Sequence, residues 1–148
     1  MNTKKGLKLK NGRMTRNAEK ELRAKDIRPS YQRKRILEYL WETKSHPTAD
    51  DIYQKLHPEI PTLSRTTVYN TLRLFEKHNI IQSVVIESNE MRFDGDVSTH
   101  GHFKCLDCQK VLDIPVKDKF KFDLKDSIVM ETHIYFRGIC PACRKERI

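Results

Sequence analysis

The pattern of apolar and polar positions changes near residue 80, and the change predicts two kinds of structure. Up to His78 the apolar residues recur at helical spacing. Residues 80–86 and 91–93 instead form short apolar runs on either side of a polar Glu-Ser-Asn-Glu segment, which predicts a β-hairpin. The first part of the chain is therefore expected to be a group of helices followed by one hairpin.

Four helices are predicted before the hairpin. Two are expected over residues 15–25 and 31–43, a third follows Thr48, and the fourth spans 64–78. Asp51, at the third position of the third helix, completes a capping-box signature with Thr48. Prolines then separate the third helix from the fourth.

The fourth predicted helix has one apolar face and one polar, basic face. Val68, Leu72 and Phe75 recur at i, i+4 and i+7 and are expected to face the core. A group of helices, the last of them basic, followed by one hairpin predicts a winged helix. The recognition helix of a winged helix enters the major groove of DNA. The residues of the polar face that we expect to contact DNA are Arg65, Tyr69, Asn70 and Arg73.

From Gly95 onward the pattern predicts a second, smaller unit. Its expected elements are strand, strand, helix and strand, over residues 102–106, 110–114, 117–127 and 129–137. The predicted fold class is therefore α+β. Its parts are a disordered basic arm over 1–14, a winged-helix DNA-binding domain over 15–94, and a small α/β domain over 95–148.

The charge balance favours a polyanionic partner. The 148 residues include 29 Lys and Arg against 20 Asp and Glu, a net charge of +9. With 37% hydrophobic and 33% charged residues the core is expected to be thin, so a metal or a partner subunit would add needed stability. No apolar run approaches the length of a membrane span or a signal peptide, so we expect a cytoplasmic protein without a membrane partner.

All four cysteines stand in two Cys-x-x-Cys pairs, Cys105 with Cys108 and Cys140 with Cys143. Each pair can place two thiolates on one side of an ion, and two pairs complete the tetrahedron that Zn²⁺ prefers. In a reducing compartment this doubled spacing favours zinc over disulfides or buried free thiols. Because four thiolates leave no open coordination position, the predicted zinc site is structural.

A second group of candidate ligands lies around residue 100, and it comprises Asp94, His100, His102 and Asp113. The two histidines are two residues apart, so a strand would place both imidazoles on one face. Imidazoles combined with carboxylates form a mixed site that suits Fe(II), Mn(II) or Zn(II). On spacing alone, a surface His-x-His pair is more often solvated than bound to a metal.

Four longer motifs resemble those of the ferric uptake regulator (Fur) superfamily. They are His-Pro-Thr-Ala-Asp-Asp-Ile-Tyr at 46–53, Ser-Arg-Thr-Thr-Val-Tyr-Asn-Thr-Leu at 64–72, the segment 100–108, and Gly-Ile-Cys-Pro-Ala-Cys at 138–143. The resemblance covers about residues 15 to 145. Within the superfamily the chain looks most like the peroxide-sensing branch, PerR.

This resemblance implies a homodimeric repressor, dimerising through residues 95–148, with a structural zinc and a regulatory Fe(II) or Mn(II). Asp113 stands where iron-uptake regulators usually carry Glu, which resembles the peroxide sensors. Thr99 and Gly101 stand where many iron and zinc regulators carry further ligands, so His133 is not expected to bind metal. The implied ligands of the regulatory metal are His46, Asp94, His100, His102 and Asp113.

The implied mechanism depends on a hinge between the two domains. A metal that binds His46 of the first domain and the ligands of the second fixes the angle between them, and so selects the conformer that fits two half-sites of palindromic DNA. If the metal is Fe(II), the resemblance points to His46 and His100 as the residues that peroxide oxidises. Peroxide is then a signal, and no other small-molecule partner is expected.

Three other interpretations remain open. An iron- or zinc-responsive uptake regulator of the same fold would differ only in its signal, because sequence discriminates poorly between such metals. A non-haem iron oxygenase or metal-dependent hydrolase would use similar ligands, but the short chain offers no further acid–base pair, so we expect no enzyme. A zinc-ribbon adaptor would bind a protein and would show no salt-dependent affinity for DNA.

Overall fold

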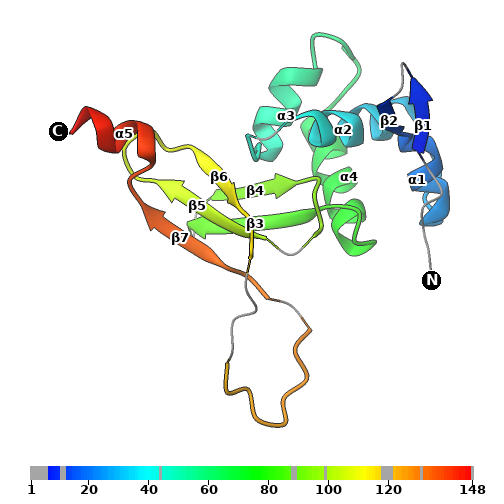
Figure 1. Cartoon of the computed structure of the whole chain (residues 1–148). Helices are drawn as coiled ribbons and strands as arrows, with labels where there is room; N and C mark the ends of the chain where they lie inside the picture. Colours follow the sequence, from blue (N-terminus) through cyan, green and yellow to red (C-terminus); the bar gives the residue numbers. More distant parts are fainter. Residues whose placement is uncertain are drawn as a thin grey trace.

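The computed structural model describes residues 7–10, 13–43, 45–87, 90–98, 100–117, 122–130 and 132–147. Figure 1 shows helices α1–α4 gathered at one side, a small sheet at the other, and the hairpin β3–β4 between them. We call α1–α4 with β3–β4 the first unit, and β5–β7 with α5 the second unit. The α+β class is confirmed, whereas the predicted domain boundaries stay predictions.

The helices of the first unit begin where capping side chains stand. Asn17, Ser30, Thr48 and Ser64 each accept a hydrogen bond from a backbone N–H of the first turn. Thr48 and Asp51 form the capping box that the sequence predicts. The helices are α1 (Ala18–Ala24), α2 (Tyr31–Glu42), α3 (Ala49–Leu56) and α4 (Arg65–Lys77).

The apolar core lies among these helices. Val68, Leu72 and Phe75 on α4 are fully buried, as their spacing predicts, and pack in one cluster with residues of the other three helices. The chain then forms β3 (Gln82–Glu87) and β4 (Glu90–Asp94), an antiparallel pair. The backbone N–H of Phe93 in β4 donates to the carbonyl of Pro47, so the loop before α3 is held beside the end of the hairpin.

The second unit is built on β5 (Gly101–Cys105). This strand lies between β6 (Val111–Ile114), which is antiparallel to it, and β7 (Tyr135–Gly138), which is parallel. A short helix that the sequence analysis did not predict, α5 (Pro141–Glu146), follows Cys140. Because β5 contains His102 and Cys105, it carries residues of both candidate ligand groups.

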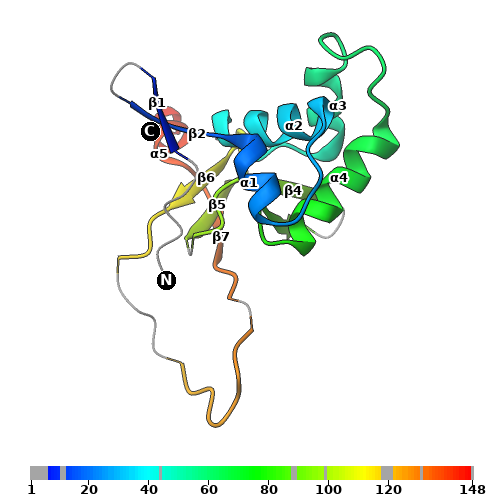
Figure 2. The ribbon, with the colours of Figure 1, turned by 90° about the vertical axis from the view of Figure 1, so that its right-hand side faces the viewer.

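Two predicted elements of the second unit are wrong. The described residues 122–127 form no helix, and residues 118–121 of the predicted span lie outside the described part of the chain. The strand expected over 129–137 is limited to β7. In both views residues 122–130 project away from the two units (Figures 1 and 2). Phe122 and Leu124 stay exposed there, so a helix would bury little apolar surface.

The amino-terminal arm also differs from the prediction. Residues 7–10 and 13–16 form an antiparallel pair, β1 (Leu7–Lys10) with β2 (Arg13–Arg16), where disorder is expected over 1–14. Alternating apolar and basic residues on either side of an Asn-Gly dipeptide are the sequence signal for such a hairpin. Within the described residues, no helix is long and apolar enough to cross a membrane.

Two candidate metal centres

Five side chains converge where the two units meet, and we call this group the hinge cluster. They come from the loop before α3, the end of β4, the residue before β5, β5 itself and β6. Each offers one ligand atom, and these atoms all lie within 4.8 Å of one another. The five residues are those that the resemblance implied: His46, Asp94, His100, His102 and Asp113.

The three imidazoles of this hinge cluster direct their Nε2 atoms at the two carboxylates. His46 Nε2 lies 2.7 Å from Asp113 Oδ1, and His100 Nε2 lies 2.8 Å from Asp94 Oδ2. His102 Nε2 lies 3.1 Å from the same Asp94 oxygen. His102 and Asp113 are direct partners across β5 and β6, which fixes their mutual position.

Neighbouring backbone groups orient the ligands. His100 Nδ1 donates to the carbonyl of Ser98 at 2.8 Å, which orients the ring so that Nε2 faces the cluster. Asp94 Oδ1 accepts the backbone N–H of Asp96 at 2.9 Å, so Oδ2 remains for the cluster. The hinge therefore presents one nitrogen and one oxygen in fixed directions before any ion is bound.

His46 has an unusual backbone conformation. Its φ of 54° lies in the left-handed region, which non-glycine residues rarely adopt. The side chain of Arg92 donates to the His46 carbonyl at 3.3 Å and helps to hold this conformation. The His46 side chain is buried, and its Nδ1 has no hydrogen-bond partner among the described residues. Backbone strain that places a side chain in this way is common at functional sites.

Burial and the carboxylates act in opposite directions on the pKa values of the hinge cluster. Burial lowers the pKa of His46, but hydrogen bonding to Asp94 and the charge of Asp113 outweigh it, and the net shift is upward. Burial also lowers the pKa of His100, but its hydrogen bonds to the Ser98 carbonyl and to Asp94 outweigh burial, and the net shift is upward. Burial raises the pKa of Asp94, but hydrogen bonds from the histidines bring it well below its usual range. The cluster thus favours positive charge at its centre.

The donor set fits a divalent metal ion. Three imidazole nitrogens and two carboxylate oxygens point at one small volume. Protons can bridge only some of these contacts, whereas all five ligand atoms can bind one divalent cation at the same time. Mixed nitrogen and oxygen donors suit Fe(II), Mn(II) or Zn(II).

Gly95 next to Asp94 permits a close approach that the sequence analysis missed. A Cβ at this position would lie 2.8 Å from the carbonyl oxygen of Leu40 and 3.1 Å from Cδ1 of Trp41, so the backbone would have to move. Gly95→Ala is therefore expected to cost about 1–3 kcal/mol in the free energy of unfolding. It is also expected to weaken metal binding, because Asp94 moves with its neighbour.

This prediction is checked by thermal unfolding and by Mn(II) titration of the variant. Gly101→Ala is the control, because the Cβ it adds would meet no atom closer than 3.4 Å. Wild-type stability and Mn(II) affinity in Gly95→Ala would show that the hinge backbone is not constrained as described.

The four cysteines form the second candidate centre. Their sulfur atoms lie within 4.8 Å of one another, and Cys108 Sγ lies 3.9 Å from Cys140 Sγ. A disulfide requires about 2.0 Å, whereas two thiolates at tetrahedral positions about 2.3 Å from one zinc ion lie about 3.8 Å apart. The observed spacing therefore fits a zinc ion and excludes a disulfide between these two residues.

Backbone donors prepare the cysteine cluster for ionisation. The backbone N–H of Cys140 donates to Cys105 Sγ at 3.3 Å, and this and other backbone donors lower the pKa of the Cys105 thiol to about 6. Hydrogen bonding to Cys140 and the other thiols raises the pKa of Cys143 to about 12. Four thiols cannot all ionise at such short range alone, but a divalent cation removes that repulsion.

The predicted DNA-contacting residues lie along the exposed face of α4. Tyr69, Asn70 and Arg73 are exposed. Arg65 is also exposed, but its Nε donates to Asp50 Oδ1 at 3.0 Å, and its guanidinium stacks over the Tyr53 ring at 4.2 Å. These contacts, which the sequence pattern does not reveal, orient the Arg65 side chain at the start of the helix.

Comparison with known proteins agrees with this geometry. The profile of the Ferric uptake regulator family matches residues 24–134. The peroxide-responsive repressor PerR of Staphylococcus epidermidis is 35% identical over 130 residues, covering 84% of this chain and 87% of that protein. This chain also aligns with the structure of PerR from Streptococcus pyogenes, a protein described as acting in peroxide sensing and gene regulation. The TM-score is 0.50 and the identity 28%, over 85% of this chain and 92% of that one. The Helicobacter pylori ferric uptake regulator Fur shares the fold, with a TM-score of 0.65 and 17% identity over 84% and 87% of the two chains.

Proposed function

Because this chain belongs to the ferric uptake regulator family, we propose that it is a metal-dependent transcriptional repressor that binds palindromic operator DNA as a homodimer and responds to peroxide. The observation that carries the proposal is the convergence of five ligand atoms from both units at the hinge. The peroxide-responsive repressors among the relatives support peroxide as the signal. Because they are named as repressors, they also argue against an oxygenase or a hydrolase.

The cysteine cluster is proposed to hold a structural Zn²⁺. Its four thiolates would fill the coordination sphere and join the start of the β5–β6 turn to the start of α5. Arg147 supports this junction through two hydrogen bonds to Asp107, at 2.6 and 2.8 Å. A cytoplasmic location, which the proposal includes, would keep the thiols reduced and available to the metal.

The hinge cluster is proposed to hold the regulatory metal, Fe(II) or Mn(II). His46 and Asp94 bind it from the first unit, and His100, His102 and Asp113 bind it from the second. These residues then fix the angle between the units, which selects the conformer that binds DNA. When bound, Fe(II) supplies the electrons that reduce peroxide. Oxidation of His46 or His100 would remove a ligand and release one side of the hinge.

The recognition surface is proposed to be the exposed face of α4. Arg65 and Tyr69 are expected to reach base edges, and Asn70 and Arg73 are expected to contact the DNA backbone. The net charge of +9 should make binding weaken steeply as the salt concentration rises.

The segment between β6 and β7 supports a homodimer. Several large apolar side chains there are exposed, and Ile128 and Met130 are the extreme cases at 87% and 86%. Single exposed apolar residues are ordinary, but a run of them marks an interaction surface. A second copy of the chain would bury the apolar side chains of this segment.

Ile128→Asp is expected to break this dimer. Burying an aspartate without a partner should cost about 3 kcal/mol or more and weaken self-association roughly a hundredfold or more. The molar mass in solution, measured by light scattering over a dilution series, checks this. Met91→Asp is the control, because Met91 is also exposed but lies on the hairpin of the first unit. An Ile128→Asp variant that remains dimeric at micromolar concentration would contradict this interface.

The peroxide response is tested anaerobically on zinc-replete protein loaded with either Fe(II) or Mn(II). Binding to an A·T-rich palindromic DNA is measured before and after addition of dilute hydrogen peroxide. The protein is then digested, and the masses of its peptides are measured by mass spectrometry. The proposal predicts that only the Fe(II) form loses DNA and gains oxygen on peptides that contain His46 or His100.

If both forms keep DNA and no histidine is oxidised, peroxide sensing is wrong. The protein is then a regulator of the same family that responds to the level of the metal itself. That outcome leaves the hinge mechanism intact, because the same five ligands would be filled and emptied by mass action.

A further inference from the structure

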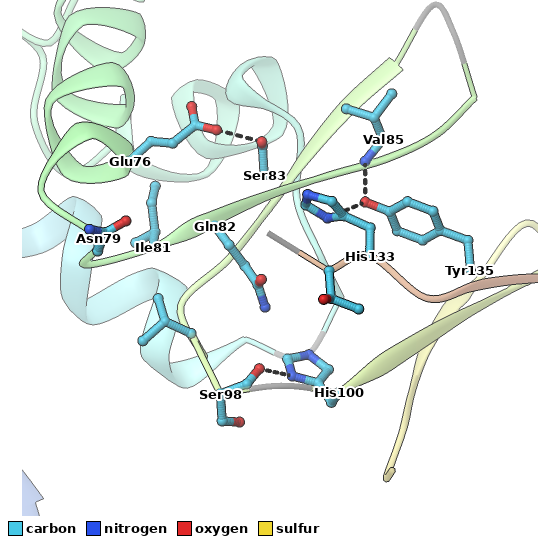
Figure 3. A pocket seen from close by; sticks show the side chains of 12 residues that line it. Glu76, Asn79, Ile81, Gln82, Ser83, Val85, Ser98, His100, His133 and Tyr135 are labelled. Atoms are coloured by element: carbon cyan, nitrogen blue, oxygen red, sulfur yellow. Dashed lines mark hydrogen bonds between the residues drawn. The ribbon is translucent and has the colours of Figure 1, made fainter. Parts of the chain in front are cut away.

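A second contact joins the two units beside the hinge cluster. The backbone N–H of Val85 in β3 donates to the hydroxyl of Tyr135 in β7 at 3.4 Å. The same hydroxyl lies 3.2 Å from His133 Nδ1, and one hydroxyl can donate and accept at the same time. Figure 3 shows the Tyr135 side chain directed at β3, with the His133 ring beside it. The contact therefore bridges the hairpin of the first unit and the sheet of the second.

The position of Tyr135 also connects this contact to the hinge cluster. Tyr135 is the register partner of His102 across the parallel pair β5–β7. Their rings lie side by side, with centroids 6.0 Å apart and an angle of 36° between the planes. One residue thus contacts the first unit through its hydroxyl and lies against a metal ligand through its ring.

The backbone group that Tyr135 binds is available because of the sheet topology. Among the described strands, β3 pairs with β4 alone, so its other edge faces the second unit. A cavity of about 620 Å³ lies between this edge and β7, with Val85, Tyr135 and His100 among its lining residues. An opening of the hinge would separate Val85 from Tyr135, whereas movements within either unit would not.

We propose that Tyr135 is a positioning residue, a latch that favours the closed arrangement of the two units and so raises the apparent affinity for the regulatory metal. This rests on the proposed function, because it assumes that the metal binds only the closed arrangement. When a ligand binds only one conformer, its apparent dissociation constant equals the intrinsic constant divided by the fraction of molecules in that conformer. The latch therefore affects the apparent metal affinity. At saturating metal the closed arrangement is already fully populated, so the latch no longer changes its population.

The test compares zinc-loaded, full-length wild type with Tyr135→Phe, which removes the hydroxyl and keeps the ring. A hydrogen bond of this kind shifts an equilibrium by roughly twofold to tenfold. We expect the Mn(II) dissociation constant of Tyr135→Phe to rise roughly twofold to fivefold. Binding to DNA at saturating Mn(II) should stay within about twofold of wild type. Tyr39→Phe, in the helical core, is the control and should leave Mn(II) affinity unchanged.

Two further readouts separate a latch from a general loss of structure. In Mn(II)-loaded protein the Val85 amide should exchange with deuterium faster in Tyr135→Phe than in wild type. The visible absorption spectrum of Co(II) in the hinge cluster should be the same in both proteins, because the ligands themselves are untouched. A changed Co(II) spectrum would overturn the latch and place the effect on His102 instead.

The latch is also overturned if wild type binds Mn(II) and DNA, and Tyr135→Phe matches it in Mn(II) affinity and Val85 exchange. A wild-type protein that binds no Mn(II) would instead contradict the proposed function, and with it the latch.

Discussion

Replacing Cys140 with serine is expected to unfold the second unit and to abolish zinc binding. Among the described residues, the buried apolar side chains of this unit are only Cys105, Val111 and Cys140, so it has almost no core of its own. Structural zinc contributes about 10–16 kcal/mol in small zinc-dependent peptides, and the loss of one thiolate removes much of it. The cysteine cluster must therefore carry most of the stability of this unit.

The measurement is zinc content per protomer together with thermal unfolding. Cys140→Ser should hold no stoichiometric zinc, and the unfolding transition of the second unit should disappear while that of the helical unit remains. Ala142→Ser is the matched control, because it adds the same hydroxyl on α5 between the two cysteines of the pair. A Cys140→Ser protein that keeps its zinc and its full transition would contradict the structural role of the cluster.

Replacing His46 with alanine is expected to uncouple metal from DNA without affecting the zinc. Among the described residues, the first unit supplies two candidate ligands, His46 and Asp94, and the hairpin holds the loop that carries His46. Changes to the partners of metal ligands typically cost about 10–100-fold in affinity. Loss of a ligand should therefore weaken Mn(II) binding by roughly a hundredfold or more.

This is measured by Mn(II) titration and by DNA binding at a fixed Mn(II) concentration that saturates the wild type. His78→Ala is the control, since it removes an imidazole of the same unit at the end of α4, away from the hinge cluster. Retention of Mn(II)-dependent DNA binding by His46→Ala would show that the metal does not act across the hinge through this residue.

The sequence predicts the elements whose stability is local or lies within one unit. The four helices, the capping box of α3 and the apolar stripe of α4 follow from periodicity and capping residues. The two cysteine pairs converge as their spacing predicts. The hinge cluster is different, because the spacing of His100 and His102 is also typical of solvated surface residues. Its gathering from five segments was predicted only through the family resemblance.

What could not be predicted depends on contacts between distant segments. The helix expected over 117–127 does not form in the described residues 122–127, where Phe122 and Leu124 stay exposed and a helix would bury little apolar surface. The close approach of Gly95 to Leu40 depends on how the hairpin packs against α2. The position of Tyr135 against Val85 depends on how the two units pack, and no local pattern encodes either contact. The pairing of Arg65 with Asp50 is likewise a tertiary contact.

The central claim is that one divalent ion at the hinge cluster brings the two units into the arrangement that binds DNA. The most direct test is to titrate zinc-replete protein with Mn(II) while binding to a palindromic A·T-rich duplex is followed at constant salt. We expect DNA affinity to rise by more than about tenfold and to saturate at one Mn(II) per protomer in addition to the zinc. DNA affinity that is the same with and without Mn(II) would contradict it.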